Sequence, residues 1–534
     1  MENKRFCAML DMSRNAVMKP EQVKKFIDIL HSFGYNSLCL YMEDVYEIEE
    51  EPYFGYMRGR YTQKEIKDIV SYCANKNIEV FPCIETLAHL ENIFNWNEYR
   101  PLRDIGDTLN VGDERIYKLI ENMIKTVKKC FTSPFVNIAM DEAVYIGRGK
   151  YLSQFGYKDS AELFNQHLKR VVEIVKKYNL IPIVCSDMFF RTENKGGYYK
   201  PVNPPVNRSG CDDLIMFYWD YEHSKVEDYD QMFKWHEHLA PIDKVWFAGS
   251  AWSFIGFTPA NALSLATLRP AMQSCRKNGV NNVVITLWGN GGAECSYYSL
   301  LPSLFFAKMI YDGVEDTSVI KQKFKELVGV DFELMQDLDS PNLICGNLDT
   351  CRNPSKYVLY SDLFHAYVAP SLPDGGSKEY ARIAKRLKQG LDTPFGYVFE
   401  FLYRLCRALE VKYGLDMLIR KSYENKDIAA LKECVKKISL CQKRIKEFHT
   451  AFKTRWYTEN KPYGFEIHDY RLGGLITRME NCKTRIKQYI DGEIDTIPEL
   501  EEKLLPYMEY HSGKEVEFTC ITDIKAVMSA NVFK

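Results

Sequence analysis

The sequence lacks the features of a membrane, secreted or nucleic-acid-binding protein. No stretch approaches the roughly 18 uninterrupted apolar residues of a membrane-spanning helix, and the apolar run Phe6–Leu10 is too short for the core of a signal peptide. Lys and Arg number 70 against 72 Asp and Glu, so the net charge of −2 produces no field that attracts nucleic acid or an anionic membrane. These absences predict a cytoplasmic protein with neither kind of partner.

Metal and cofactor motifs are also missing. The 16 cysteines form no Cys-x-x-Cys pair and no Cys/His cluster, and several, such as Cys39, Cys83 and Cys185, lie within apolar runs. We therefore expect buried free thiols and neither zinc nor disulfides. No His/Asp/Glu cluster has the spacing of metal ligands, and no Gly-x-Gly-x-x-Gly follows the first apolar run, so we expect no metal and no cofactor.

Short apolar runs do recur, and longer amphipathic stretches separate them up to about residue 300. One such stretch, Pro20–Leu30, places Val23, Phe26, Ile27 and Leu30 on one helical face. This alternation is typical of a parallel sheet covered by helices, and eight units favour a (β/α)8 barrel over a doubly wound sheet, which usually has fewer strands. The eight runs are Phe6–Leu10, Ser37–Tyr41, Ile78–Ile84, Phe135–Met140, Ile181–Cys185, Leu214–Trp219, Val245–Ala248 and Asn282–Trp288.

The remainder of the chain has a different pattern. After about residue 315 the strand signals fade, and long charged amphipathic stretches such as 428–452 and 472–490 follow. We therefore predict two domains, a (β/α)8 TIM barrel over residues 1–312 and an α-helical domain over residues 313–534.

Polar and aromatic residues follow the predicted strands. In a (β/α)8 barrel the active site lies at the carboxyl ends of the strands, so these side chains would meet on one rim. Indole faces beside carboxylates suit a sugar ring, whose C–H face is apolar and whose edge is polar. The strand ends contribute Arg14, Glu43 and Asp44, His89, Asp141 and Glu142, Tyr218 and Trp219, Trp252, Trp288 and Glu294.

Asp141 and Glu142 are the sharpest local feature. Successive strand residues point to opposite faces, so two adjacent carboxylates can share a pocket only where the strand ends and the chain turns. The neighbours Ile138, Ala139 and Met140 would give Glu142 apolar surroundings that favour its protonated form, while Asp141 stays ionised. The pair therefore predicts two carboxylates with different tasks.

These residues resemble glycoside hydrolase family 20, the β-N-acetylhexosaminidases, whose catalytic strand ends in a consecutive Asp-Glu pair. The resemblance is carried by Asn137-Ile-Ala-Met-Asp141-Glu142 and by Leu40-Tyr-Met-Glu-Asp-Val-Tyr-Glu47, and it extends over roughly residues 5–312. It implies retaining, substrate-assisted hydrolysis through an oxazolinium ion, with Asp141 orienting the 2-acetamido group and Glu142 acting as acid and then base. The substrate would be a small glycan or glycoside with a terminal N-acetylhexosamine.

The resemblance also implies roles for the other rim residues. Arg14 would hold the 3- and 4-hydroxyls, and Asp44, or its neighbour Glu43, would form a relay with His89 to Glu142. Trp219, Trp252 and Trp288 would line the acetamido pocket and the ring face, and Glu294 would bind a distal hydroxyl. The run after residue 248 contains no tyrosine to bind the acetamido oxygen, so we predict that Tyr218 takes this role.

Three alternatives stay open. The same scaffold could act on a modified amino sugar, such as a 6-substituted glucosamine, or could bind carbohydrate without turnover.

In the helical domain, residues 456–474 are dense in aromatic, glycine and polar residues. This segment would either pack between helices or reach over a barrel mouth, in its own chain or in a homodimer partner.

Overall fold

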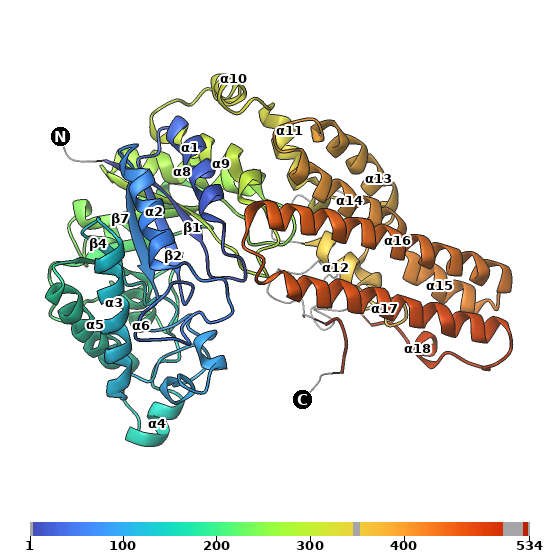
Figure 1. Ribbon diagram of the computed structural model, residues 1–534, viewed down its shortest axis with the longest axis horizontal. Coiled ribbons are helices and arrows are strands. Elements are labelled where there is room, and N and C mark those ends of the chain that lie inside the picture. The colour runs from blue at the N-terminus through green and yellow to red at the C-terminus, as the bar shows by residue number, and fades with distance from the viewer. Residues whose placement is uncertain (1–3, 345–352, 506–526, 532–534) are drawn as a thin grey trace. The chain divides into compact units, whose positions relative to one another are not determined.

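The eight apolar runs form eight parallel strands that close into a barrel in chain order, with β8 hydrogen-bonded to β1 (Figure 1). This computed structural model describes residues 4–344, 353–505 and 527–531. It confirms the predicted fold class, a closed parallel barrel followed by a helical region. The strands are β1 Arg5–Asp11, β2 Ser37–Met42, β3 Glu79–Ile84, β4 Phe135–Asn137, β5 Ile181–Cys185, β6 Ile215–Trp219, β7 Val245–Ser250 and β8 Asn282–Leu287.

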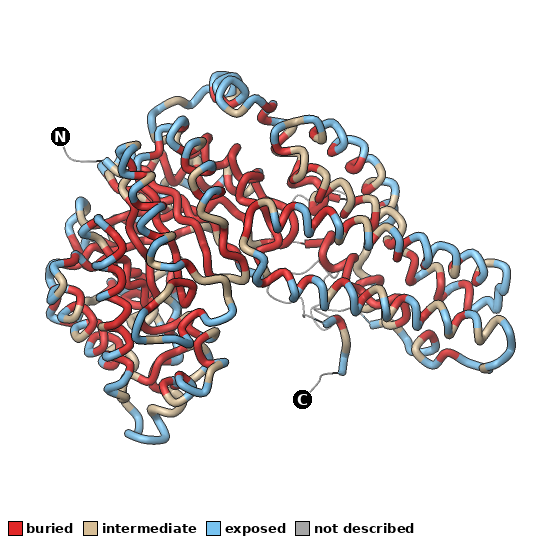
Figure 2. The backbone as a smooth tube through the Cα atoms, in the orientation of Figure 1, coloured by how far each residue is buried: buried red, intermediate tan, exposed pale blue. Residues whose placement is uncertain are grey.

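The strands are apolar along their length because both faces of the sheet are covered. Every residue of β2, β6, β7 and β8 is buried, and the strands form the red interior of the barrel in Figure 2. A parallel sheet buried on both faces reads as continuous apolar runs instead of an alternating pattern. This is why the runs could be recognised in the sequence.

The helices around the barrel begin at residues suited to that position. Pro20 opens α1, as predicted, and Thr62 and Glu65 form a capping box at the start of α2. Up to residue 328 the helices are α1 Pro20–Ser32, α2 Gln63–Ala74, α3 Glu114–Cys130, α4 Lys150–Phe155, α5 Ser160–Lys177, α6 Asp187–Glu193, α7 Val226–His236, α8 Asn261–Lys277, α9 Leu301–Tyr311 and α10 Thr317–Val328.

The rest of the described chain is helical. Its core includes Phe401 of α14 and Phe448 and Phe452 of α16, whose rings lie 4.9–5.9 Å apart. Such contacts are those of a packed bundle. The helices are α11 Phe332–Gln336, α12 Pro354–Tyr360, α13 Gly376–Leu387, α14 Gly396–Lys412, α15 Leu415–Glu424, α16 Ile428–Glu459, α17 Phe465–Ile490 and α18 Pro498–Glu501.

The chain divides into two compact units. The barrel unit comprises residues 1–251, 263–288 and 303–323, and the helical unit comprises residues 252–262, 289–302 and 324–534. Two segments that the sequence assigns to the barrel domain, 252–262 and 289–302, therefore group with the helices. They follow β7 and β8, and they carry Trp252 and Glu294.

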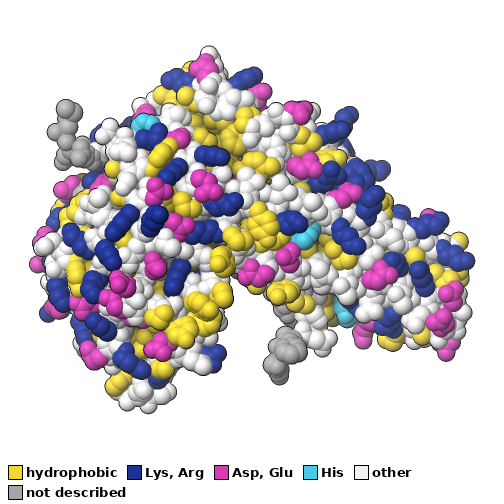
Figure 3. Space-filling view, in the orientation of Figure 1, with side chains coloured by type: hydrophobic (Ala, Val, Ile, Leu, Met, Phe, Trp, Pro, Cys, Tyr) yellow, Lys and Arg dark blue, Asp and Glu magenta, His cyan; other side chains and the backbone are white. Residues whose placement is uncertain are grey.

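The surface and the thiols agree with the composition. Lys and Arg are intermixed with Asp and Glu on the face shown in Figure 3. Every cysteine in the described ranges is buried with a free thiol. No helix in the same ranges is both long and apolar enough to cross a bilayer.

Candidate active site

The chain turns sharply after β4, directly before the Asp-Glu pair. β4 ends at Asn137, so the expectation that the strand continues to Met140 is wrong. Ala139, Met140 and Glu142 all have left-handed backbone, with φ of 53°, 71° and 55°. The Asn137 side chain accepts a hydrogen bond from the Ala139 amide at 2.9 Å and holds this turn. The two consecutive carboxylates thus leave the strand where its regular alternation has stopped.

Asp141 forms an ion pair with His89 from the loop after β3. His89 Nε2 lies 3.4 Å from Asp141 Oδ2 and 3.6 Å from Glu142 Oε2, and its Nδ1 lies 3.6 Å from Asp107. Burial alone would raise the pKa of Asp141, but the charge of His89 outweighs it and the pKa is lowered. Burial opposes protonation of His89, but the Asp141 carboxylate raises the pKa of His89 to about 10. Asp141 is therefore ionised beside a protonated imidazole at neutral pH.

Glu142 lies at the open edge of this cluster. Its side chain is 48% exposed, so the expectation of enclosing apolar surroundings is wrong. The carboxylate Oε1 lies 3.4 Å from Arg191, and the Glu142 amide donates to Asp187 Oδ2 at 3.1 Å. The left-handed turn accounts for the difference, because it directs Glu142 outward, away from the apolar residues that precede it in the sequence.

Asp187 and Arg191 complete the support for Glu142. Both belong to α6, which begins two residues after β5 ends, and Arg191 Nε donates to Asp187 at 2.9 Å. Burial, together with the charge of Asp141, raises the pKa of Asp187 to about 7. The sequence showed Asp187 only as a strand-end residue and gave no role to Arg191. One sequence feature could have indicated this pair: Asp187 and Arg191 are four residues apart, which places them on one face of a helix that follows a strand end.

Arg14 lies in a second charged cluster at the ends of β1 and β2. It donates to Asp11 Oδ2 at 3.0 Å, and it lies 3.6 Å from Glu43. Its guanidinium is 4.7 Å from the ring centre of Trp288 and 5.0 Å from that of Tyr41. Burial raises the pKa of Glu43 to about 7, although Arg14 acts in the opposite direction. Arg14 and Trp288 are therefore brought together.

Asp44 and Glu43 have separate partners. Asp44 is fully buried, and it pairs with Arg58 at 3.0 Å. The charge of His89 acts on Glu43, which also contacts Asn92 at 3.5 Å. Among the described contacts, Asp44 does not reach His89. Adjacent strand-end residues point in opposite directions, and here Glu43 is the one that faces Arg14.

Tyr218 and Trp219 of β6 also diverge. The Tyr218 ring packs on Phe233 and His236 of α7, and its hydroxyl donates to Asp220 at 2.7 Å, so it faces the helical layer. Trp219 instead packs on Tyr198 and Tyr221 at 4.8 and 5.5 Å.

Tyr221, two residues after β6 ends, lies on the Trp219 side of this segment. Its ring lies 5.5 Å from that of Trp219, whereas the Tyr218 ring packs on α7. Burial raises the pKa of Tyr221. The prediction that Tyr218 lies at the site is therefore wrong. The sequence could have indicated this, because Tyr218 and Trp219 are adjacent in a strand and cannot both face the barrel interior.

Trp252 and Glu294 belong to the helical unit. The Trp252 ring stacks on Phe254 at 4.6 Å. Glu294 is buried, 2.7 Å from Lys356 Nζ and 3.4 Å from Arg471. Residues 456–474 comprise the end of α16, the connection and the first turns of α17, and His468 in this segment contacts the Gly292 carbonyl at 3.0 Å. Within its unit, this segment therefore packs against the loop that carries Glu294.

His89, Asp141 and Glu142 also have the proximity of metal ligands. One potential ligand atom from each lies within 4.8 Å of the other two. The raised pKa of His89, about 10, favours a protonated ring, which has no lone pair to offer a metal. The arrangement therefore fits proton handling better than metal binding.

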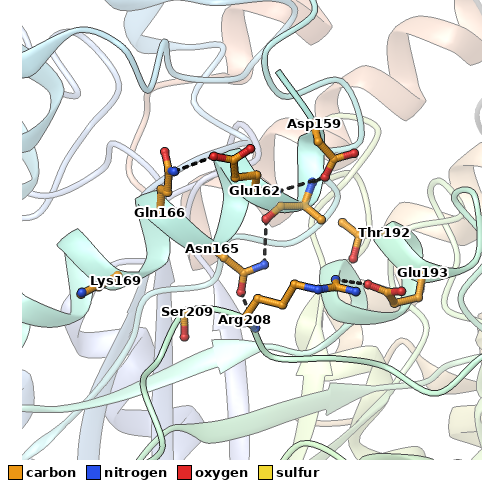
Figure 4. Close-up of a pocket in the computed structure, with 10 residues that line it drawn as sticks. Asp159, Glu162, Asn165, Gln166, Lys169, Thr192, Glu193, Arg208 and Ser209 are labelled. Atoms are coloured by element: carbon orange, nitrogen blue, oxygen red, sulfur yellow. Dashed lines mark hydrogen bonds and ion pairs between the residues drawn. The ribbon is translucent and has the colours of Figure 1, made fainter. Parts of the chain in front are cut away.

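A separate pocket of about 540 Å³ lies between α5, α6 and the loop before β6 (Figure 4). Its lining includes Asn165, Lys169, Glu193 and Arg208, and an ion pair joins Glu193 to Arg208. None of the carboxylates or aromatic residues described above lines it, so it is distinct from the candidate site.

Two family models match this sequence. The "Glycosyl hydrolase family 20, catalytic domain" model matches residues 7–225, and the "Glycoside Hydrolase 20C C-terminal domain" model matches residues 330–518. The chain belongs to glycoside hydrolase family 20. This confirms the resemblance seen in the sequence, and it shows that both the barrel and the helical unit contain segments of this family.

Individual relatives in family 20 are distant. Hexosaminidase D from Homo sapiens is 25% identical over 185 residues, which are 33% of this chain and 38% of that protein. Hexosaminidase D from Bos taurus is 24% identical over 180 residues, which are 31% of this chain and 51% of that protein. The match therefore spans between about a third and a half of these relatives' length.

Solved family 20 structures are similarly distant. A β-N-acetylhexosaminidase from Bacteroides fragilis has 19% identity and a TM-score of 0.46, over 61% of this chain and 70% of that one. An exo-β-N-acetylglucosaminidase from Vibrio harveyi, solved with N-acetylglucosamine, has 16% identity and a TM-score of 0.46, over 62% of this chain and 58% of that one. The family models are thus what places this chain in family 20.

Proposed function

We propose that the protein is an exo-acting, retaining β-N-acetylhexosaminidase that removes terminal β-linked GlcNAc and/or GalNAc by substrate-assisted catalysis. One observation carries the proposal. The turn after β4 places Asp141 and Glu142 side by side next to His89, with one carboxylate buried and ionised and the other at the open edge. Membership of family 20 supports it.

In the first step, the substrate's own 2-acetamido oxygen attacks the anomeric carbon, and an oxazolinium ion forms. Asp141 accepts a hydrogen bond from the acetamido N–H and stabilises the positive charge that develops on that nitrogen. The lowered pKa of Asp141 suits this task, because the carboxylate must remain ionised throughout. No nucleophile from the protein is required.

Glu142 supplies the proton and then takes one back. As general acid it protonates the glycosidic oxygen as the C–O bond breaks, and as general base it deprotonates the water that opens the oxazolinium ion. Its exposed side chain can meet both the leaving group and the incoming water. His89 and Arg191, at 3.6 and 3.4 Å, hold its carboxylate from two sides.

The remaining rim residues bind the sugar. Arg14 holds the 3- and 4-hydroxyls, and Trp219 and Trp288 line the acetamido pocket and the ring face. Tyr221, in place of Tyr218, donates its hydroxyl to the acetamido oxygen, since its ring packs beside Trp219 whereas Tyr218 faces α7. Trp252 and Glu294 keep the roles that the family resemblance implies, at the ring face and at a distal hydroxyl.

The direct test is release of 4-nitrophenol from its β-GlcNAc and β-GalNAc glycosides by the wild type, Asp141→Asn and Glu142→Gln. A thiazoline, which resembles the oxazolinium ion, is included as inhibitor. We expect release by the wild type, inhibition by the thiazoline, and a loss of kcat/KM of at least about a hundredfold in each variant.

Azide separates the two carboxylate roles. It should restore turnover in Glu142→Gln by replacing water, because an external nucleophile needs no general base, but it should leave Asp141→Asn impaired. Folded wild type that releases nitrophenol from neither glycoside would contradict the proposal and would favour the modified-sugar or the non-catalytic alternative.

A further inference from the structure

Two exposed tyrosines and a half-buried tryptophan form a cluster on two loops of the barrel unit. Tyr53 and Tyr56 lie on the loop between β2 and α2, and Trp96 lies on the loop between β3 and α3. The two tyrosines are 45% and 41% exposed. Their ring centres lie 5.9 and 5.2 Å from that of Trp96, and 6.0 Å from each other. We call these three residues the aromatic platform.

The platform has a rigid base. Phe54 and Tyr99, which belong to the same two loops, are buried with their ring centres 6.4 Å apart. The Tyr99 hydroxyl and the Asn122 amide of α3 both donate to Glu51, at 3.0 and 2.8 Å. The two loops that carry the platform are therefore fixed by buried side chains, so a ligand would bind there with little loss of backbone freedom.

Both loops also touch the end of β2, where the candidate site begins. Gly55 lies between the two tyrosines in a left-handed conformation, with φ of 65°, and an added Cβ would lie 2.0 Å from the Asp44 carbonyl oxygen. On the other loop, Asn92 donates to Glu43 at 3.5 Å, four residues before Trp96. The platform is thus anchored on the backbone and side chains next to Arg14 and His89, at the rim that carries the catalytic carboxylates.

We propose that Tyr53, Tyr56 and Trp96 bind the sugar on the leaving-group side of the scissile bond. The inference rests on the proposed function. An exo-acting enzyme encloses one terminal sugar, so the rest of the glycan lies outside the pocket, over the rim. The C–H face of a pyranose stacks on an aromatic ring, and phenol hydroxyls can bind its edge. Single exposed rings are ordinary, but a supported cluster of three beside a catalytic rim indicates a binding surface.

The test compares a disaccharide, GlcNAc β-linked to a second GlcNAc, with a thiazoline that fills only the terminal-sugar pocket. In Trp96→Ala, kcat/KM for the disaccharide should fall about tenfold, mainly through KM, while the thiazoline inhibition constant stays unchanged. Trp96→Phe should recover most of the loss. Tyr53→Ser/Tyr56→Ser, a variant that leaves Trp96 in place, should show the same split.

The matched control is Tyr72→Ala. Tyr72 is a partly exposed tyrosine near the end of α2 that leads into β3, at the opposite end of the barrel from the rim. The Tyr72→Ala substitution should change neither kcat/KM for the disaccharide nor the thiazoline inhibition constant. Unchanged disaccharide kinetics in Trp96→Ala and in the double variant would overturn the platform. A wild type that neither binds the thiazoline nor cleaves the disaccharide would overturn the proposed function, and the platform with it.

Discussion

The barrel unit and the helical unit treat buried charge differently. At the barrel mouth, Asp11, Glu43, Glu85, Asp141 and Asp187 are gathered near Arg14, His89 and Arg191. Carboxylates exceed cations there, and burial raises the pKa values of Glu43 and Asp187 to about 7. The mouth therefore holds charge in an energetically unfavourable arrangement.

In the helical unit, buried cations are matched to acceptors. Arg420 of α15 donates to four backbone carbonyls, those of Phe364, Glu499, Leu500 and Glu502, at 2.7–3.0 Å. Lys412 of α14 donates to the carbonyls of Val358 and Ser361 at the end of α12. Except for that of Phe364, these carbonyls lie in or next to the last turn of α12 or α18, where backbone acceptors have no partner within the helix. Charge that completes hydrogen bonding serves the fold, whereas charge crowded against like charge marks a site for chemistry.

The largest expected effect comes from His89, because its charge offsets the crowding at the mouth. His89→Gln should lower kcat/KM about a hundredfold, since Asp141 loses its counter-charge. The pKa of Asp141 is then no longer lowered, so the acidic limb of the pH–rate profile should move to higher pH. His449→Gln, in a histidine paired with Asp469 in the helical unit, is the control. An unmoved acidic limb in His89→Gln would contradict the assignment.

The second prediction concerns Arg420, where we expect a loss of stability without a loss of activity. Arg420→Met leaves four carbonyls without their donor, so the free energy of unfolding should fall by about 3 kcal/mol, while kcat/KM of the folded protein stays the same. Denaturant unfolding and active-site titration measure the two quantities. Arg404→Met, in a half-buried arginine paired with Glu400 and Glu447, should cost less than about 1 kcal/mol. Equal losses in both variants would argue against the role of the carbonyls.

The third prediction uses two tyrosines three residues apart. Tyr221→Phe should lower kcat/KM about tenfold, because the acetamido oxygen loses a donor, with little change in stability. Tyr218→Phe should leave kcat/KM within about twofold and cost about 1 kcal/mol of stability through the lost bond to Asp220. Kinetics and unfolding of the pair decide between them. The opposite pattern would restore Tyr218 as the acetamido ligand.

The smallest expected effect is a pH dependence of stability. The pKa of Asp187 rises from 3.8 to about 7 on folding, mainly through burial. Between about pH 4 and 7 the folded state therefore retains a proton that the unfolded state has lost, and stability falls as the pH rises through this window. Asp187→Asn should flatten the decline by about 1 kcal/mol, measured by unfolding at pH 6.5 and pH 8. Parallel wild-type and variant curves would show that Asp187 is ionised in the folded protein.

Much of the fold could be predicted because the barrel strands are buried on both faces and appear as separate apolar runs. The ends of the strands were harder to predict. β4 stops at Asn137 although Ile138, Ala139 and Met140 continue the apolar run, since no glycine or proline marks the left-handed turn. Local sequence carries no signal for such a turn when tertiary contacts hold it.

Site residues followed the same division. Residues directly after a strand, such as Asp141 and Arg14, could be proposed from position alone. The prediction put Asp44 ahead of Glu43 and named Tyr218 where Tyr221 is now proposed. Each pair has similar chemistry, and the direction of a side chain depends on where the strand's alternation stops. Arg191 and the aromatic platform belong to segments beyond the strand ends. Which residues become neighbours in those segments depends on the folded structure and could not be predicted from the sequence.

The left-handed turn after β4 has a consequence for how this protein can change over generations. Three non-glycine residues with positive φ cost on the order of 1 kcal/mol or more each, and the surrounding barrel supplies that energy. Substitutions that relax the turn would make the protein more stable while separating Asp141 from Glu142. A lineage under selection for stability alone would therefore drift towards a more stable barrel in which the two carboxylates no longer lie side by side.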